Sequence, residues 1–355
     1  MVKNNLFYYA TSELSQDAFI CYLASFAFKD ASVDTALNEC ARNLFHLFVP
    51  EIDAEDVVLE KIEQQFNLGK NGRVDVLFTA QSKGKNYKII IEDKKFTGDY
   101  TGQLINYKDG ILSIYPEYEV RGVFYKTGFQ SNLSAAEEAN YTIVTREKIL
   151  EFLAPYIKKI NNQIIIDYYY YWKEFQEETL SFKNTSVQNW TWKQVYGFYD
   201  YLKNSDFTKN NALWMEYNYV ANPTGGFYGL WFGPSTSDVN IDGIWFEFYL
   251  QLETVTAEEK TDVKICLKLC HKDDHKLENV RNARNKIIYA DNWEYRAKRY
   301  RFRKPKRVAG AKHMTIGIFD MEYTNTEELL LAIQEALNEY NKMHSSLKSG
   351  AESEK

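Results

Sequence analysis

Residues 72–107 set the architecture of this chain. They read Gly72-Arg-Val-Asp75-Val-Leu-Phe78, then Tyr87-Lys-Ile-Ile-Ile-Glu92-Asp93-Lys94-Lys95, and then Gln103-Leu-Ile-Asn-Tyr107. The first two runs are short, apolar and rich in β-branched residues, and the turn-like segment 82–86 separates them, so the pattern predicts a β-hairpin. Beyond Gly102 the apolar residues recur at helical spacing, which predicts a helix over 101–115.

The predicted strands bring several polar side chains to one face. Side chains alternate between the two faces of a strand, so Glu92 and Lys94 project together while Asp93 points the other way. Asp75 on the partner strand can therefore meet Glu92. Gln103 and Tyr107 are four residues apart and share one face of the following helix, which we expect to lean over the strand ends.

Two converging carboxylates are oxygen ligands of the kind that a hard cation prefers. A site of this type, in which the ion keeps several waters, suits Mg²⁺ or Mn²⁺ better than Zn²⁺. An ammonium group beside the ion suits a phosphate substrate, because phosphodiester hydrolysis needs an activated water and neutralisation of developing charge. Asp75, Glu92 and Lys94 supply these parts.

In this arrangement the chain resembles the PD-(D/E)XK nuclease superfamily. Asp75 matches the acid on the second core strand, and Glu92-Asp93-Lys94 matches the (D/E)-x-K motif on the third. Gln103-x-x-x-Tyr107 resembles the QxxxY motif of the exonuclease-like branch. Val74 stands where the superfamily pattern has a proline, at a position that varies among its members. The resemblance implies metal ligation by Asp75 and Glu92, a water-polarising role for Lys94, and positioning roles for Gln103 and Tyr107.

A further acid precedes this region. Residues 6–30 predict a first helix capped by Thr11 or Ser12, and the phrase around Glu13 resembles the opening of one bacterial branch of the superfamily. The resemblance makes Glu13 a candidate third metal ligand. An equally weighted interpretation is that Glu13 only stabilises the first turn, near the positive end of the helix dipole.

The remaining periodicity predicts the rest of the first domain. The expected order is helix, helix, three strands, helix, strand, strand and helix, with the third and fourth strands parallel. We therefore predict an α/β, restriction-endonuclease-like mixed sheet core flanked by helices over residues 1–160. Residues 161–355 predict an α+β domain with an aromatic-rich, mainly antiparallel sheet, for which we expect a role in substrate or partner recognition.

A dense basic run lies in the second half. Cations interleaved with aromatic residues can neutralise phosphates while the rings stack or pack inward, so we expect a nucleic-acid contact here. The alternative is a solvated edge strand whose charge prevents aggregation. The candidate nucleic-acid-binding residues are Lys298, Arg299, Arg301, Arg303, Lys304, Lys306 and Arg307.

Composition limits the function classes. The chain has 355 residues, 45% of them hydrophobic, and a net charge of −6, which argues against binding nucleic acid by bulk charge but allows a local basic groove. Without a long apolar run or a signal-peptide core, we expect a cytoplasmic protein with no membrane partner. The leading hypothesis is a Mg²⁺- or Mn²⁺-dependent nuclease acting on nucleic acid, foremost DNA, in defence or repair. The alternative is a catalytically inactive nucleic-acid-binding or regulatory protein that retains the nuclease fold.

Overall fold

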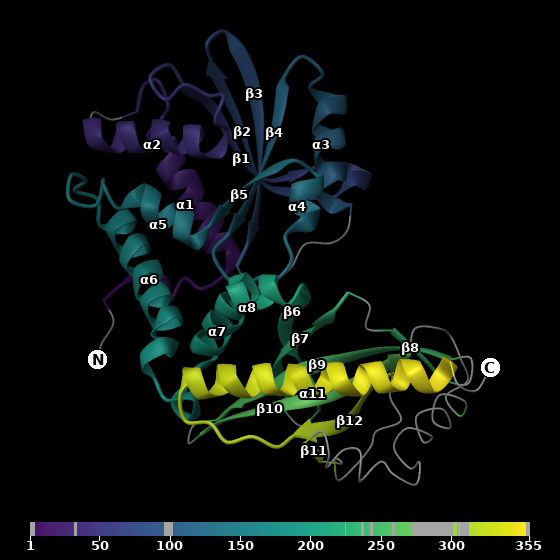
Figure 1. Ribbon diagram of the computed structural model, residues 1–355. Coiled ribbons are helices and arrows are strands. Elements are labelled where there is room, and N and C mark those ends of the chain that lie inside the picture. The colour runs from purple at the N-terminus through teal and green to yellow at the C-terminus, as the bar shows by residue number, and fades with distance from the viewer. Residues whose placement is uncertain are drawn as a thin grey trace. The chain divides into compact units, whose positions relative to one another are not determined.

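The computed structural model divides into two compact units, Met1–Glu177 and Glu178–Lys355 (Figure 1). The predicted boundary at residue 160 precedes α6 (Gln163–Leu180), whereas this division falls near the end of that helix. The reason is aromatic packing, because Tyr168 of α6 stacks on Phe19 of the first unit with 3.5 Å between ring centroids. The structure describes residues 4–31, 34–95, 102–223, 225–235, 238–241, 244–257, 260–271, 278, 301–303, 305 and 312–352.

The first unit is built on a five-stranded mixed sheet with the strand order β1-β2-β3-β4-β5. Its strands are β1 (Val58–Asn67), β2 (Arg73–Ser82), β3 (Lys85–Lys94), β4 (Glu119–Lys126) and β5 (Tyr141–Thr145). Its other helices are α1 (Glu13–Ser25), α2 (Thr35–Phe48), α3 (Gln103–Ile114), α4 (Ser134–Glu138) and α5 (Arg146–Leu153). The first three strands are antiparallel, and β3, β4 and β5 are parallel, so the predicted parallel β3–β4 pairing is confirmed. The predicted element order is correct except for α4, a short helix between the last two strands where no helix was predicted.

The predicted hairpin is formed by β2 and β3. A two-residue turn joins them, and both of its residues, Lys83 (φ 48°) and Gly84 (φ 72°), have left-handed backbones. Such turns match the right-handed twist of the strands and fix their register. The register pairs Val76 with Ile91 and Leu77 with Ile90.

Helices cover both faces of this sheet. Figure 1 shows α1, α2 and α5 on one side and α3 and α4 on the other. On the α3 side, Ile90 of β3 belongs to a buried cluster with Leu104, Tyr107 and Ile111. On the α1 side, the side chain of Asp93 contacts Gln16. Because side chains alternate along β3, adjacent polar residues of this strand face different helical layers, one on the α3 side and the next on the α1 side.

Gly122 of β4 lies directly beside Tyr141 of β5. A Cβ added at Gly122 would lie 2.5 to 2.6 Å from three ring atoms of Tyr141. The ring cannot move aside freely, since its hydroxyl donates a hydrogen bond of 2.9 Å to the carbonyl of Leu104. We expect Gly122→Ala to lower the free energy of unfolding by about 1–3 kcal/mol through overpacking, as measured by chemical denaturation.

A double-mutant cycle provides the control for this prediction. In a Tyr141→Ala background the ring is absent, so Gly122→Ala should cost far less than in the wild type. An equal cost in both backgrounds would contradict the steric explanation.

The second unit is also mixed α/β and rich in aromatic residues. Its seven-stranded sheet is antiparallel at each described pair, in agreement with the predicted antiparallel sheet. The sheet consists of β6 (Leu213–Val220), β7 (Phe227–Pro234), β8 (Asp238–Ile241), β9 (Ile244–Thr256), β10 (Thr261–His271), β11 (Phe302–Arg303) and β12 (His313–Phe319). Among its described residues the α-helices are α7 (Trp192–Asn204), α8 (Asp206–Asn210) and α11 (Thr326–Glu352).

Helix α11 lies along this sheet (Figure 1). Tyr340 of α11 stacks on Phe248 of β9 and donates a 2.6 Å hydrogen bond to its carbonyl oxygen. The aromatic residues of this half therefore include much of its core. Within the described ranges, no helix is both long enough and apolar enough to cross a membrane.

Candidate active site

The predicted acids and lysine meet on the α3 side of the first sheet. Glu92 and Lys94 are two residues apart and therefore project from the same face of β3. The Lys94 ammonium lies 2.7 Å from Oε1 of Glu92. Glu92 is 1% exposed. Asp75 of β2 is half-buried, and one of its carboxylate oxygens, Oδ2, accepts a 3.0 Å hydrogen bond from the backbone N–H of Asp93. The hairpin thus brings together the three residues of the predicted motif.

Helix α3 adds the two residues of the QxxxY pattern. Gln103 is the first residue of α3, and its Nε2 donates to the Tyr107 hydroxyl at 2.5 Å and to Glu92 Oε1 at 3.4 Å. The ring of Tyr107 packs against Gly72 at the start of β2, where an added Cβ would lie 3.0 Å from it. The structure therefore brings Gln103 and Tyr107 to the same site as Glu92.

Burial and neighbouring charges change the pKa values of Glu92 and Lys94. The pKa of Glu92 is raised to about 8, mainly by burial and then by repulsion from Asp75, although the Lys94 ammonium opposes this. Burial alone would lower the pKa of Lys94, but Glu92 and Asp75 outweigh that effect and keep it above its usual value. Burial and the neighbouring acid thus favour the protonated form of Glu92, while Lys94 stays charged.

The neighbouring residues Asp93 and Lys95 make their contacts on the other side of the sheet, with α1 and the segment before it. Asp93 is 1% exposed, and burial raises its pKa well above the usual range, with a further contribution from Asp17. Its Oδ1 accepts a hydrogen bond from Gln16. The Lys95 ammonium donates to the carbonyl of Thr11 at 3.1 Å. These contacts tie β3 to α1 and its N-terminal approach.

Glu13 lies at the end of β3. It is the first residue of α1, which is capped by Ser12 as predicted, and its Oε1 accepts a 2.9 Å hydrogen bond from the backbone N–H of Lys95. The structure thus brings Glu13 to the strand that carries Glu92, and it gives this carboxylate a backbone donor.

Sequence reasoning missed two residues beside Asp75. Asp17 of α1 is 2% exposed, and burial followed by repulsion from Asp75 raises its pKa to about 7. The side-chain amide of Gln65 on β1 donates to Asp17 Oδ2 at 3.3 Å and to Asp75 Oδ1 at 3.4 Å. The spacing of Glu13 and Asp17, four residues apart on one helix face, was a signal that could have found Asp17.

Several buried oxygens near the site have no hydrogen-bond partner. They are Oε2 of Glu92, Oε1 of Gln103 and Oδ1 of Asp17. Unpartnered buried acceptors are costly, and a cation would satisfy them. Among the residues that the structure describes, no three side chains of His, Cys, Asp or Glu lie close enough together to hold a metal ion. A cation between Asp75 and Glu92 would therefore need other oxygens, such as waters or the Gln103 amide.

The basic run of the second unit is described only at Arg301 and Arg303 among its candidate residues. Arg301 lies 2.5 Å from the carboxylate of Glu335 and stacks over the Phe319 ring, and Arg303 lies 3.7 Å from Asp320. Both arginines thus have acidic partners within the chain, which favours the edge-strand interpretation at these two positions. The other candidates, Lys298, Arg299, Lys304, Lys306 and Arg307, lie outside the described residues.

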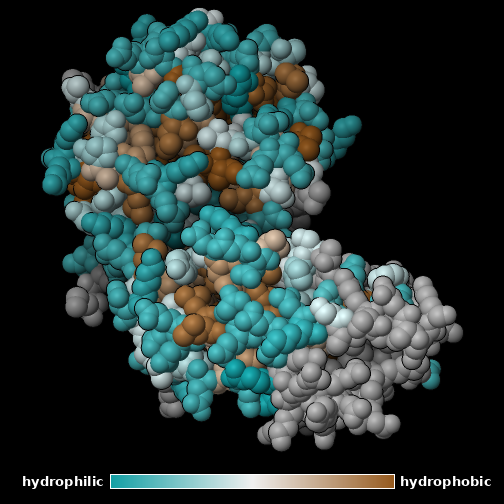
Figure 2. Space-filling view, in the orientation of Figure 1, coloured by the Kyte–Doolittle hydropathy of each residue, from teal (hydrophilic) through white to brown (hydrophobic). Residues whose placement is uncertain are grey.

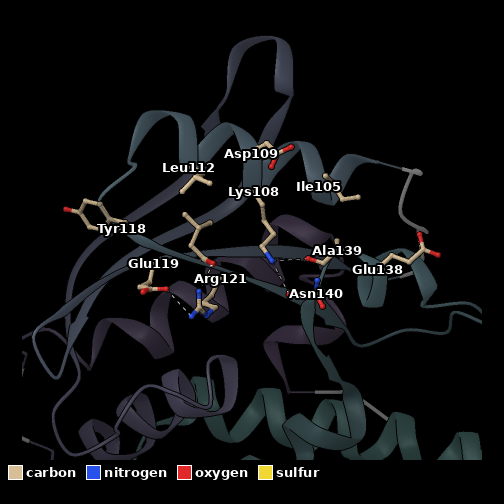
Figure 3. Close-up of a pocket in the computed structure, with 11 residues that line it drawn as sticks. Ile105, Lys108, Asp109, Leu112, Tyr118, Glu119, Arg121, Glu138, Ala139 and Asn140 are labelled. Atoms are coloured by element: carbon tan, nitrogen blue, oxygen red, sulfur yellow. Dashed lines mark hydrogen bonds and ion pairs between the residues drawn. The ribbon is translucent and has the colours of Figure 1, made fainter.

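A separate groove of about 490 Å³ runs along α3 on the outer surface of the first unit (Figure 3). Ile105 and Leu112 of α3 are 46% and 48% exposed, and Figure 2 shows apolar patches in the region that α3 occupies in Figure 1. Between them, Lys108 points toward β5 and donates to the carbonyls of Ala139 and Asn140. The residues that line this groove do not include the predicted catalytic residues.

Comparison of the chain with models of protein families, with curated proteins and with solved structures gave no match.

Proposed function

We propose that the first unit is a divalent-metal-dependent nuclease with a restriction-endonuclease-like core of the PD-(D/E)XK type. The observation that supports this proposal most strongly is the convergence of Asp75, Glu92 and Lys94 on one face of the β2–β3 hairpin. The strand order supports this proposal, because the antiparallel hairpin is followed by a helix and a parallel strand, as the superfamily resemblance implies.

The residues present fit a hard cation. Asp75 and Glu92 would hold Mg²⁺ or Mn²⁺, since carboxylate oxygens are the preferred ligands of these ions and Glu92 Oε2 is buried without a partner. When bound, the ion would activate water and neutralise charge on the phosphate. Gln103 orients Glu92 through its 3.4 Å contact, and Tyr107 in turn holds Gln103.

Lys94 is the residue closest to the chemistry. Its raised pKa keeps the ammonium charged across the physiological range, so it can bind a phosphate oxygen or orient the attacking water. Its contact with Glu92 holds it beside the carboxylate pair.

DNA is the proposed substrate, in a cytoplasmic defence or repair setting. With a chain charge of −6, substrate binding would depend on local basic surface. Arg301 and Arg303 have acidic partners within the chain, so we propose that other cations supply this surface. An inactive nucleic-acid-binding protein is the second candidate, favoured by the lack of a third carboxylate close enough to complete the metal site in the described ranges.

The test is cleavage of linear, circular and single-stranded DNA, and of RNA, with Mg²⁺, with Mn²⁺ and with EDTA. The proposal requires cleavage that depends on the metal and is lost in Asp75→Ala. Cleavage that persists in Asp75→Ala would reject the site. Salt-dependent binding of DNA without cleavage under any metal would favour the second candidate.

A further inference from the structure

Gln65 has an unusual backbone in the middle of a pairing region. Its φ is 51°, a left-handed value that residues other than glycine rarely adopt and that carries strain. The register passes from Gln64 opposite Val76 to Phe66 opposite Val74, which places Gln65 opposite Asp75. Strand β1 continues to Asn67, so the strained residue is not needed to end the strand or reverse the chain.

The side chain of Gln65 accounts for this backbone. Its Nε2 reaches Asp17 Oδ2 on α1 and Asp75 Oδ1 on β2, and thereby bridges two acids on different elements. The other oxygen of Asp75 accepts from the backbone N–H of Asp93. The Asp75 carboxylate is therefore held from two directions, by an amide side chain and by a backbone amide. Strained positions of this kind cluster at functional sites, where they aim a side chain.

We propose that Gln65 is a positioning residue: its left-handed backbone directs the amide so that it fixes the Asp75 carboxylate in the orientation needed to ligate the cation. This inference rests on the proposed function for the role of the cation. The fixing of Asp75 itself does not depend on it.

The test compares Gln65→Gly with the wild type. Glycine accepts the left-handed backbone without strain but lacks the amide. We expect the midpoint of thermal unfolding to stay the same or rise, while the affinity for Mn²⁺ alone, measured by calorimetry, falls about 10-fold or more, as it does when partners of metal ligands are removed. A residue with only a structural role would lose stability and affinity together, and that result would overturn the proposal.

Two further variants sharpen the comparison. Gln65→Asn keeps an amide and tolerates the left-handed backbone, but it is one methylene shorter and should not span both acids, so it should also lose Mn²⁺ affinity. Asn140→Gly is the matched control, because Asn140 has a φ of 52° in the same unit. It should change stability in the same sense as Gln65→Gly and leave the Mn²⁺ affinity unchanged. A loss of affinity in this control would overturn the proposal.

Hydrogen exchange of the Asp93 amide provides a readout without metal. This N–H donates to Asp75 Oδ2, so a carboxylate released by Gln65→Gly should let it exchange about 10-fold faster or more, while the amide of Ile91 is unchanged. Unchanged exchange at Asp93 would overturn the role of Gln65, whatever the activity. If the wild type binds no Mn²⁺, the proposed function fails, and the exchange of Asp93 still decides whether Gln65 positions Asp75.

Discussion

Lys94→Ala is expected to reduce the rate of DNA cleavage by about 10²–10³-fold, the usual cost of removing one preorganised group that stabilises developing charge. The ammonium lies 2.7 Å from Glu92 and faces the same side of the sheet as Asp75, so under the proposed function its loss would remove a positive charge beside the metal-binding carboxylates. The measurement is single-turnover cleavage at saturating Mg²⁺, which reports the chemical step. We expect the affinity for Mn²⁺ to increase slightly, because a competing positive charge has been removed.

The matched control for this prediction is Lys85→Ala. Lys85 begins the same strand, carries the same charge and is largely exposed, with Glu119 3.8 Å away. Its removal should change the cleavage rate less than about 3-fold through long-range charge alone. Equal losses in the two variants would show that the effect comes from net charge, and the assignment of Lys94 would then be wrong.

Glu92→Gln is expected to stabilise the metal-free protein and to abolish the proposed nuclease activity. Glu92 and Asp75 are carboxylates brought together in a buried site, and an amide at position 92 removes the repulsion while keeping the shape. The same change removes a charged ligand, so the affinity for Mn²⁺ should fall by more than about 100-fold, above the usual effect of a residue that only supports a ligand. Thermal unfolding and Mn²⁺ calorimetry on the same samples measure both outcomes.

The stability gain should depend on pH with a defined sign. The pKa of Glu92 is about 8 in the folded protein and 4.5 for an unperturbed glutamate, so between these values the folded state retains a proton that the unfolded chain has released. The free energy of unfolding of the metal-free wild type should therefore decrease as pH rises from about 4.5 to about 8. Asp17, with a pKa of about 7, contributes in the same direction.

Glu92→Gln should flatten this decrease. At pH 8 and above, its free energy of unfolding should exceed that of the wild type by a few kcal/mol, as an order of magnitude. Glu119 of β4, which is half-buried, provides the control, since Glu119→Gln should not flatten this decrease. A wild-type stability that rises over the same pH range would contradict the buried, repelling arrangement of Glu92 and Asp75.

Local patterns were sufficient to predict the hairpin and the helix that follows it. Each is set by neighbouring residues: the runs before and after Lys83-Gly84 are apolar, and Gln103 and Tyr107 recur at helical spacing. The alternation of side chains then placed Glu92 and Lys94 on the face that meets Asp75, and the hydrogen bonds and ion pairs agree with that placement.

Other parts of the site could not be read from the sequence, because they depend on contacts between distant segments. Asp17 enters the site only through the packing of α1 on the sheet, and Gln65 through a backbone angle that its residue type does not signal. The basic run shows the opposite difficulty. Arg301 looked like a phosphate ligand by local charge, but Glu335, far along the chain, is its partner.

The two-residue turn at Lys83 and Gly84 has a consequence for evolution and engineering of this chain. Acids and lysines come in adjacent pairs at the end of β3, with Lys95 directly after its last residue, so a slip of one residue against β2 would present Asp93 and Lys95 to α3 in place of Glu92 and Lys94. Such a protein would keep every letter of the motif and have a different set of charges on each face. We therefore expect a tag or an insertion in this turn to disrupt the candidate site. Motif conservation alone is a poor guide to activity in relatives whose turn differs in length.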